Sequence, residues 1–432
     1  MNYPEALRYL DRLVNREATA GRIHGLSLDS MRALVDGMAN PQNDLRTIHV
    51  TGTNGKGSVV SMVGSLLMAA GLRVGCYLSP HVDIVRERIA LNGEMISEEA
   101  FADLVGDVAF YVHEANQEPS YFEFLTAAAL LWFSNEAVEV AVVEVGLLGR
   151  FDATNVIDAE VAVVTNVGRD HTDGVGDWQR AIAEEKAGII TENNPLILGK
   201  VSPDVRDLFV AEKPDPLYSL NGEFNITSTQ VAIGGQVVGF QTPSGCYEDV
   251  FIPLYGSHQA VNAALALTAV EAFLGNPLEL DVVTEGFRSV ELPGRLEVLS
   301  RHPLVLADGA HNQDSARYLA EGVLEAFPVE NCVLVLGVLE PHKPSEILDE
   351  LLKLNPEVVI TCTAPSERAI SGDNLASIAL DLGLQVEVVQ DPSEAVERAI
   401  SISRENDLVL VTGSFYIVTP ARHTVSLFKR DF

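Results

Sequence analysis

The sequence predicts an α/β protein with two domains: a P-loop mononucleotide-binding domain with a small antiparallel sheet, and a smaller, Rossmann-like open-sheet domain at the C-terminal end. Three observations predict this fold. Continuous apolar runs alternate with helical stretches along most of the chain, as in parallel sheets buried on both faces. A glycine-rich loop joins one apolar run directly to a helix. The alternation is interrupted at Pro293-Gly294 and then begins again.

Length and composition indicate a soluble globular protein. The chain has 432 residues, enough for two domains, of which 47% are hydrophobic and 21% charged. Its net charge of −32 argues against nucleic-acid binding, because neutralising phosphates requires a basic surface. Four scattered cysteines without a C-x-x-C pair favour reduced thiols. We find neither an apolar run of the ~20 residues that a membrane span needs nor a signal peptide. We therefore expect a cytoplasmic protein without membrane partners, and a monomer as the default.

The larger domain begins with the elements around the glycine loop. Two helices are expected near 2–19 and 29–39, before the strand RTIHV that runs into the loop. A helix should follow the loop from about Gly57 to Ala70, then the strand RVGCYLS and a hairpin turn at Asn92-Gly93. The alternation continues with helices near 97–116, 122–137, 178–190 and 203–212 and with the buried strands VEVAVVEVG and EVAVVTNVG.

The pattern then changes twice along the chain. Residues 223–254 alternate Thr, Gly and Val in the manner of antiparallel strands, and a helix at 258–275 resumes the earlier pattern. Beyond Pro293-Gly294 a second series of strands alternates with helices: LVLADGA, NCVLVLGV, EVVITCTA, QVEVV and DLVLVTGS. We place the domains at 1–292, an ATP-binding domain, and 293–432, the smaller open-sheet domain.

The loop TGTNGKGS at 51–58 has the features of a phosphate-binding loop. The strict pattern G-x-x-x-x-G-K-[ST] fails, because Val50 replaces its first glycine and Gly57 separates Lys56 from Ser58. Glycines let backbone N–H groups approach an anion, and the following helix N-terminus adds partial positive charge. Lys56 would reach the β- and γ-phosphates, and Ser58 would offer a hydroxyl to Mg²⁺. The plainer alternative is a glycine-rich turn with a solvated lysine. The predicted nucleotide-binding residues here are Thr53, Asn54, Gly55, Lys56, Gly57 and Ser58.

A glutamate within a buried strand is a second candidate for chemistry. Glu144 stands between apolar neighbours in VVEVG. Burying a carboxylate is costly unless it is paired or binds a metal. A metal ligand is therefore favoured over an unpaired core carboxylate.

The form T-G-T-N-G-K-G-S resembles the phosphate loop of the folylpolyglutamate synthase/dihydrofolate synthase family. The related Mur ligases have a similar loop but usually lack the glycine after the lysine, so Gly57 favours the folate branch. The resemblance covers nearly the whole chain, with ordered motifs in both predicted domains. It implies an ATP-dependent ligase with two magnesium sites.

The resemblance implies further metal-site residues. The segment SPHVDIVRERI is similar to a family segment whose serine helps to bind magnesium, which implicates Ser79. The histidine of TNVGRDH, His171, resembles the residue that binds the second magnesium ion. With Ser58 and Glu144 these complete the expected ligands. Lys186 in E-K-A-G could be an ordinary residue of a charged helix face, but it resembles a lysine that CO₂ converts to N6-carboxylysine.

Substrate-binding residues are also implied by the resemblance. SYFEF resembles the segment that contacts the pterin, which makes Phe122 and Glu123 candidates, although Phe122 could equally be a core residue. GLLGRFDATN resembles the family's G-x-G-G-x-x-D-[AS]-T-N and supplies Phe151, Asp152 and Ala153. Leu148 departs from this pattern by replacing the first glycine of its pair, so this loop could approach pterin or phosphate differently.

A last set of motifs joins the two predicted domains. GSHQAVNA resembles a family helix that places Asn262 near the adenine nucleotide, and LPGRLEVL supplies Arg295. VLADGAHN supplies Asp308 and His311; in the family the arginine and aspartate reach ATP, and the histidine lies near the incoming amino acid. TGSFYIV resembles a terminal signature, but Phe415 stands where a small or aliphatic residue is common, so it carries little weight. The candidate catalytic residues are Lys56, His171, Lys186, Asp308 and His311.

The resemblance implies that a substrate carboxylate attacks the γ-phosphoryl group of ATP and that the amine of L-glutamate then displaces phosphate from the acyl phosphate. The acceptor would be dihydropteroate, a reduced folate, or both, and we favour both. The nearest alternative is a Mur-type ligase that adds an amino acid to a UDP-sugar peptide, but too few residues precede the loop for a separate UDP-binding domain. The other is a P-loop nucleotide-binding protein without ligase activity, which would need no site for two metals.

Overall fold

The computed structural model describes residues 1–15, 27–169 and 176–428. The chain forms two compact units. Unit 1 comprises residues 1–230, 237–253 and 259–291, and unit 2 comprises residues 231–236, 254–258 and 292–432. No helix in the described ranges is long and apolar enough to cross a membrane.

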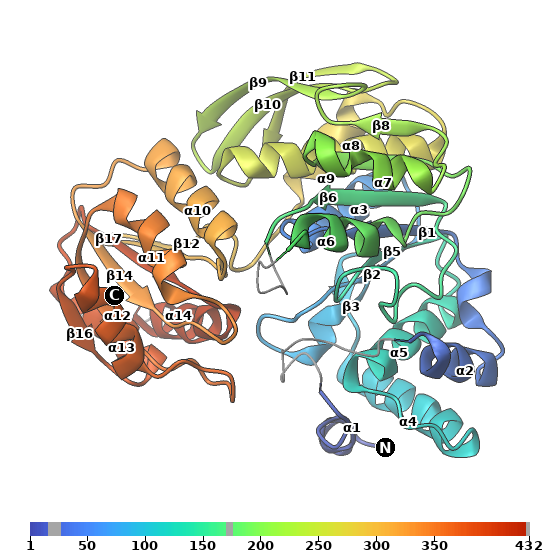
Figure 1. The fold of residues 1–432 in the computed structure, drawn as a ribbon, viewed down its shortest axis with the longest axis horizontal. Helices are drawn as coiled ribbons and strands as arrows, with labels where there is room; N and C mark the ends of the chain where they lie inside the picture. Colours follow the sequence, from blue (N-terminus) through green and yellow to red (C-terminus); the bar gives the residue numbers. More distant parts are fainter. Residues whose placement is uncertain (16–26, 170–175, 429–432) are drawn as a thin grey trace. The chain divides into compact units, whose positions relative to one another are not determined.

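Unit 1 is built around an eight-stranded sheet. Its strands are β1 (Thr47–Thr51), β2 (Val74–Tyr77), β3 (Ile89–Leu91), β4 (Glu94–Met95), β5 (Val140–Glu144), β6 (Val161–Asn166), β7 (Leu196–Lys200) and β8 (Leu217–Ser219). They lie in the order β4-β3-β2-β5-β1-β6-β7-β8 (Figure 1). β1 is entirely buried and runs parallel to both neighbours, β5 and β6. The predicted α/β class is therefore confirmed, and the glycine loop leaves an interior strand.

Several helices of unit 1 pack against this sheet, and others pack against those helices. They are α1 (Tyr3–Leu10), α2 (Asp29–Gly37), α3 (Lys56–Ala69), α4 (Glu98–Glu114), α5 (Tyr121–Asn135), α6 (Trp178–Ala187), α7 (Pro203–Ala211), α8 (Ser257–Leu274) and α9 (Leu280–Arg288), with 3-10 turns η1 (Pro41–Asp44) and η2 (Val85–Arg88). α3 packs against β2, β5 and α9, which explains why its sequence is apolar nearly all round. α9 follows the predicted helix at 258–275 and was not anticipated.

The first helix is shorter than the predicted 2–19. A capping box starts it, in which the Asn2 side chain accepts from Glu5 N and the Glu5 carboxylate accepts from Asn2 N. It ends at Leu10. The Val14 carbonyl accepts a hydrogen bond from Tyr121 N at 3.0 Å, so the chain must leave the helix to reach the start of α5.

The two predicted antiparallel features are present. β3 and β4 pair antiparallel across Asn92 (φ 48°) and Gly93 (φ 79°), and positive φ at both positions is typical of a type I′ hairpin. A separate sheet has the order β11-β10-β9 and consists of β9 (Asn225–Ala232), β10 (Gly235–Gln241) and β11 (Cys246–Ile252). Two residues join β9 to β10, too few for a parallel crossover, so this pair is antiparallel.

Unit 2 contains a second, six-stranded sheet. Its strands are β12 (Glu297–Arg301), β13 (Leu304–Ala307), β14 (Cys332–Leu336), β15 (Pro356–Thr361), β16 (Val386–Val388) and β17 (Leu408–Thr412), in the order β12-β13-β17-β14-β15-β16. β12 is antiparallel to β13, and the other neighbours are parallel. Its helices are α10 (Gln313–Ala326), α11 (Pro344–Leu351), α12 (Gly372–Asp381), α13 (Pro392–Ile402) and α14 (Phe415–Phe428), with η3 (Leu352–Leu354).

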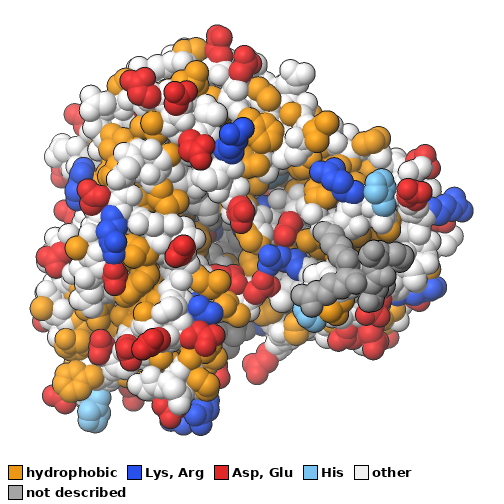
Figure 2. All heavy atoms as spheres, turned by 180° about the vertical axis from the view of Figure 1, so that it is seen from behind, with side chains coloured by type: hydrophobic (Ala, Val, Ile, Leu, Met, Phe, Trp, Pro, Cys, Tyr) orange, Lys and Arg blue, Asp and Glu red, His pale blue; other side chains and the backbone are white. Residues whose placement is uncertain are grey.

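The strong negative charge is carried on the surface. Acidic side chains are spread over the face shown in Figure 2, with Arg and Lys between them. Some form exposed ion pairs, such as Arg46 with Glu160 at 2.8 Å and Lys213 with Glu192 at 2.8 Å. Pairs of this kind typically contribute ~0–1 kcal/mol each, so they do not explain the fold.

Candidate active site

The loops after four neighbouring parallel strands of unit 1 carry most of the predicted site. β1 leads into the glycine loop, β2 is followed by Ser79, β5 ends at Glu144 and β6 ends at Asn166. Because these strands are consecutive in the order β2-β5-β1-β6, their carboxyl ends meet at one edge of the sheet. Open α/β sheets bind ligands at this edge.

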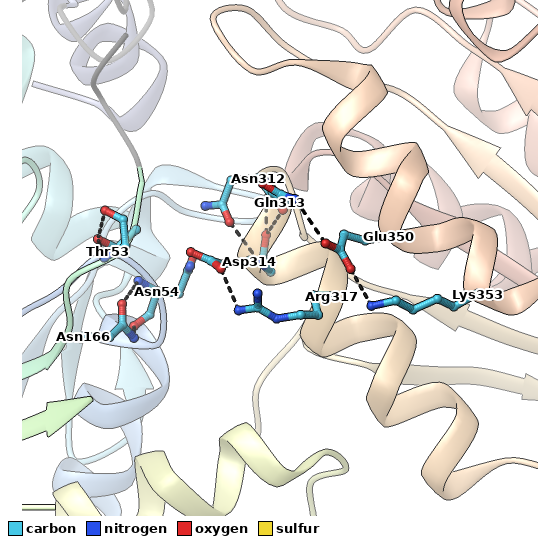
Figure 3. A network of polar contacts seen from close by, with 11 residues as sticks. Thr53, Asn54, Asn166, Asn312, Gln313, Asp314, Arg317, Glu350 and Lys353 are labelled. Atoms are coloured by element: carbon cyan, nitrogen blue, oxygen red, sulfur yellow. Dashed lines mark hydrogen bonds and ion pairs between the residues drawn. The ribbon is translucent and has the colours of Figure 1, made fainter. Parts of the chain in front are cut away.

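The glycine loop is fastened to the end of β6. Asn54 N donates to Asn166 Oδ1 at 3.0 Å, and the Asn54 carbonyl accepts from Thr165 Oγ1 at 2.6 Å and from Asn166 Nδ2 at 2.8 Å (Figure 3). The Thr53 hydroxyl donates a hydrogen bond to the carbonyl of Gly168 and accepts one from the N–H of Gly168. Sequence reasoning missed Thr165 and Asn166, although a polar pair that ends an apolar strand was the available signal.

Lys56 lies over its own loop. Its Nζ donates to the Gly52 carbonyl at 3.2 Å and to the Thr53 carbonyl at 3.3 Å. The ammonium group is thereby held at the first turn of α3, which begins at Lys56. A cation beside a helix N-terminus favours an anion at the same place.

Two glycines of the loop are required by close approach and by backbone conformation. At Gly52 (φ 150°) an added Cβ would lie 1.8 Å from Thr165 Oγ1. At Gly55 (φ 85°) it would lie 2.6 Å from Asn262 Oδ1, so the predicted Asn262 does lie beside the loop. Asn262 is buried and donates through Nδ2 to Gln259 Oε1 at 3.0 Å.

Glu144 lies between the glycine loop and the loop after β2. Its side chain is 3% exposed, and its Oε2 accepts from Ser79 N at 3.0 Å. A Cβ added to Gly57 would lie 3.3 Å from the same oxygen. The extra glycine therefore leaves room for this carboxylate beside α3.

The donors present suit magnesium. Mg²⁺ in nucleotide sites is held by one or two carboxylates together with phosphate oxygens and waters, and Glu144, Ser58 and Ser79 are such hard oxygen donors. Among the residues that the structure describes, no group of three His, Cys, Asp or Glu side chains could hold a metal by itself. The fourth predicted ligand, His171, lies outside the described residues.

A small pocket adjoins the glycine loop. It is lined by Gly52, Thr53, Lys56, Gly146, Leu148, Ile182 and Lys186. Lys186, on α6, is only 4% exposed, so its side chain belongs to the interior and not to a charged helix face. The fold thus brings two lysines that are distant in the sequence to the wall of one pocket.

Leu148 has an unusual backbone for its residue type. Its φ is 62°, in the left-handed region, which costs a residue with a Cβ roughly 1–2 kcal/mol. Its carbonyl accepts from Thr51 Oγ1 at 2.7 Å. The backbone conformation at this position is the one that a glycine adopts without strain.

Asp152 is bonded within its own loop. Its carboxylate accepts from Leu147 N at 2.7 Å, from Thr154 N at 3.0 Å and from Thr154 Oγ1 at 2.5 Å. Burial raises the pKa of Asp152 to about 6, despite these hydrogen bonds. Of its neighbours, Phe151 is 41% exposed and Ala153 is buried. The structure therefore places Asp152 as the organiser of the loop.

The two residues predicted to contact a pterin lie at the start of α5. Glu123 closes a capping box with Ser120, whose N and Oγ donate to Glu123 Oε2 at 2.7 Å and 2.6 Å. The Phe122 ring lies 6.0 Å from that of Tyr77, between ring centres, and directly against Gly146. Phe122 therefore lies beside the loop that lines the pocket, whereas Glu123 is occupied in the helix cap.

A buried histidine connects β1 to this loop. His49 Nε2 lies 2.8 Å from Thr154 Oγ1, whose hydroxyl donates to Asp152, so the imidazole is the donor. Its Nδ1 has no hydrogen-bond partner among the residues that the structure describes, and the side chain is fully buried. Burial lowers the pKa of His49 to about 3, because a charged ring would lose its hydration.

His49 should therefore make the fold sensitive to acid. A folded-state pKa below the unfolded value of 6.5 gives stability that is complete above pH 6.5 and is lost as the pH falls towards about 3. The loss approaches ~1.4 kcal/mol per pH unit within that window. His49→Gln can still donate to Thr154 but cannot take up a proton in this pH range. We therefore expect its free energy of unfolding, measured by urea titration, to decrease less than that of the wild type between pH 7 and pH 4. Asp152 titrates in the opposite sense but is present in both proteins. Parallel pH curves would contradict the assignment.

The candidate residues of unit 2 are organised around a buried aspartate. Asp308 follows β13 and accepts from Leu296 N at 2.7 Å and Ala310 N at 2.8 Å. Burial raises the pKa of Asp308, and the positive charge of Arg295 opposes this effect. Burial, with a smaller contribution from Arg295, lowers the pKa of His258 to about 4. The structure thus brings Arg295 and Asp308 together.

Phe415 supports Arg295. The Cζ of Arg295 lies 4.2 Å from the centre of the Phe415 ring, within cation–π range. A Cβ added to Gly309 would lie 2.5 Å from this ring, and one added to Gly294 would lie 3.2 Å from it. Two glycines therefore make room for the ring. The motif TGSFYIV, which carried little weight in the sequence, therefore contains Phe415, a residue that contacts Arg295 of the candidate site.

His311 lies in the same loop as Asp308. Its Nδ1 lies 2.8 Å from the Gly309 carbonyl and must donate to it, which leaves Nε2 unprotonated in the neutral ring. The ring of His342 lies 4.9 Å away, between ring centres. Asn312 caps α10, and polar contacts continue along α10 through Asp314 with Arg317 at 2.6 Å (Figure 3). His342 was not singled out from the sequence.

Comparisons with known proteins agree with this arrangement. Residues 50–270 match the family described as the Mur ligase middle domain, and residues 294–415 match the Mur ligase, glutamate ligase domain. A dihydrofolate synthase/folylpolyglutamate synthase of Mycobacterium tuberculosis is 37% identical over 94% of this chain and 90% of that protein. The protein of the same name from Bacillus subtilis is 33% identical over 91% of this chain and 94% of that protein. A crystal structure of Mycobacterium tuberculosis folylpolyglutamate synthase complexed with ADP and AMPPCP superposes with a TM-score of 0.91 at 35% identity, covering 98% of both chains.

Proposed function

The chain belongs to the dihydrofolate synthase/folylpolyglutamate synthase family of Mur ligases, and from this premise we propose that it uses ATP to attach L-glutamate to dihydropteroate and to reduced folates. The reaction passes through an acyl phosphate. The substrate carboxylate attacks the γ-phosphorus of ATP and releases ADP; the α-amine of glutamate then attacks the acyl carbon, releasing inorganic phosphate and a proton. The observation that carries this proposal is the pocket that Lys56 and Lys186 line beside the glycine loop.

The glycine loop is the proposed nucleotide site. Its residues Thr53 to Ser58 bind the phosphates through backbone N–H groups at the start of α3, and Lys56 neutralises charge on the β- and γ-phosphates. The transferring group gains charge on its equatorial oxygens, so catalysis consists mainly of positioning and charge stabilisation. Asn262, beside Gly55, contacts the nucleotide.

Ser58, Ser79, Glu144 and His171 are the proposed magnesium ligands. Bound magnesium supplies Lewis-acid polarisation of phosphate and carboxylate oxygens. Glu144 is fixed for this purpose by the Ser79 N–H, which orients one of its oxygens.

Lys186 is the proposed site of N6-carboxylysine. Its neutral amine would add to CO₂ and lose one proton, which replaces a cation by an anion. The position of the Lys186 side chain supports this assignment, because it is buried and lines the same pocket as Lys56. An intact-mass increment of one CO₂ in bicarbonate buffer, lost in Lys186→Arg, would identify the modification.

The remaining predicted residues are assigned to the second substrate and the nucleotide. Arg295 and Asp308 bind ATP, and His311 lies near the incoming glutamate. Phe122, Phe151 and Ala153 border the pterin. Asp152 holds the loop that carries Phe151 and Ala153, and Glu123 holds the start of α5, which carries Phe122.

We assign residues 1–292 as the ATP-binding domain and 293–432 as the ligase domain, in a protein that acts as a cytoplasmic monomer. The unpaired cysteines, three of them buried, are consistent with a reducing environment.

A substrate panel tests the proposed function. Phosphate release from ATP should require glutamate together with an acceptor, and both dihydropteroate and tetrahydrofolate should serve, each yielding a product one glutamyl residue heavier by mass spectrometry. A UDP-sugar peptide should not serve as acceptor. ATP turnover that is independent of every pteroate and folate acceptor would refute the proposal, and activity with only one acceptor would refute bifunctionality.

A further inference from the structure

Leu148 is held in the left-handed conformation by contacts on both sides of it. Its carbonyl accepts from Thr51 Oγ1 at 2.7 Å, and the preceding N–H, of Leu147, donates to Asp152 Oδ2 at 2.7 Å. Two residues further on, Arg150 N donates to the Glu185 carbonyl at 2.7 Å. A strained residue persists when its surroundings fix it, and such strain concentrates at functional sites.

The Leu148 side chain forms part of the pocket wall. Of the seven described residues that line the pocket, only Leu148 and Ile182 contribute branched apolar side chains, and the others are glycines, Thr53 and the two lysines. An apolar group cannot bind phosphate or carboxylate. It can occupy space that water would otherwise fill, at a position where a glycine would fit the backbone without strain.

We infer that Leu148 excludes water from the reaction pocket and thereby protects the acyl phosphate from hydrolysis. This inference rests on the proposed function. Hydrolysis would begin with attack of water on the acyl phosphate; it returns the free carboxylate, inorganic phosphate and one proton, and it consumes ATP without forming an amide. Attack by the α-amine of glutamate yields the same phosphate but forms the amide. Water exclusion therefore affects the ratio of phosphate released to glutamate incorporated.

The test compares this ratio among variants of the full chain. Leu148→Ala keeps a Cβ but removes the branched end of the side chain, whereas Leu148→Gly also suits the backbone at φ 62°. Both should raise the ratio of phosphate to glutamyl product severalfold above that of the wild type, most clearly at low glutamate concentration. Leu148→Met, which retains apolar bulk, should stay close to the wild-type ratio.

Leu147→Ala is the matched control, because Leu147 is the adjacent leucine of the same loop and does not line the pocket. Its ratio should be that of the wild type. If Leu148→Ala folds poorly, Leu148→Gly carries the test, since its backbone is relieved. A normal ratio in a folded Leu148→Gly or Leu148→Ala overturns the inference, as does an equal rise in Leu147→Ala. Failure of the proposed function is distinguishable, because the wild type itself would then form no glutamylated product.

Discussion

Glu144→Gln should lower the glutamate-dependent formation of ADP about 10³-fold, which corresponds to ~4 kcal/mol of transition-state stabilisation. The substitution keeps the shape of the side chain and an oxygen that can accept from Ser79 N, at 3.0 Å in the wild type. It removes the negative charge from a position that is 3% exposed, and a neutral amide is a much weaker magnesium ligand. The measurement is steady-state ADP release at saturating ATP over a range of magnesium concentrations.

Glu160→Gln is the control for this experiment. Glu160 is an exposed carboxylate paired with Arg46, and the loss of such a pair should leave turnover unchanged. Excess magnesium should restore part of the activity of Glu144→Gln if the defect is metal affinity. Wild-type turnover in Glu144→Gln at limiting magnesium would exclude a metal-binding role for Glu144.

Gly52→Ala should destabilise the fold by ~2–4 kcal/mol and abolish nucleotide binding. Alanine at a positive φ costs ~1 kcal/mol, and overpacking against a fixed neighbour adds ~1–3 kcal/mol. The added methyl would lie 1.8 Å from Thr165 Oγ1, so Thr165 must move and release the Asn54 carbonyl. The free energy of unfolding from urea titration and the ADP affinity from calorimetry report the two effects.

Gly71→Ala separates backbone strain from this collision. Gly71 also has a positive φ, 90°, but a Cβ there would meet no atom of the described part of the chain within 4 Å. It should cost only ~1 kcal/mol and leave ADP affinity unchanged. Equal destabilisation by the two substitutions would show that contact with Thr165 is unimportant.

Local pattern was sufficient to predict most of the strands and the residues that follow them, although β7, β8 and β12 were not predicted. β1, β5 and β6 are continuous apolar runs with an abrupt polar end, and this pattern predicted Glu144 and the glycine loop as parts of the site. The order of the strands was not predictable in the same way. β17 lies between β13 and β14 because pairing is decided by packing between distant segments, and the apolar runs of unit 2 are nearly equivalent by composition.

The sequence also could not predict the direction in which the side chain of a site residue points. Asp152 and Glu123 have the residue types that bind substrates, but hydrogen bonds to nearby backbone N–H groups compete for the same oxygens. The structure shows this local bonding in both, within the loop for Asp152 and within the helix cap for Glu123. Phe415 is the opposite case, a residue given little weight that does contact the candidate site. It contacts Arg295, which is far away in the sequence, and no local sequence pattern predicts such a contact.

The fastening of the glycine loop to β6 has a kinetic consequence. Asn54 is held by Thr165 and Asn166, and Lys56 caps the carbonyls of Gly52 and Thr53, so the loop keeps its shape through contacts within the protein. An arriving nucleotide meets a preorganised cradle, and the ordering entropy that a disordered loop would lose on association is largely absent. Binding of a nucleotide would then require desolvation and movement of the Lys56 side chain away from the Gly52 and Thr53 carbonyls. For the nucleotide site that we propose at this loop, we therefore expect capture to be governed by diffusion against a strongly negative background and its rate to rise as salt screens that field.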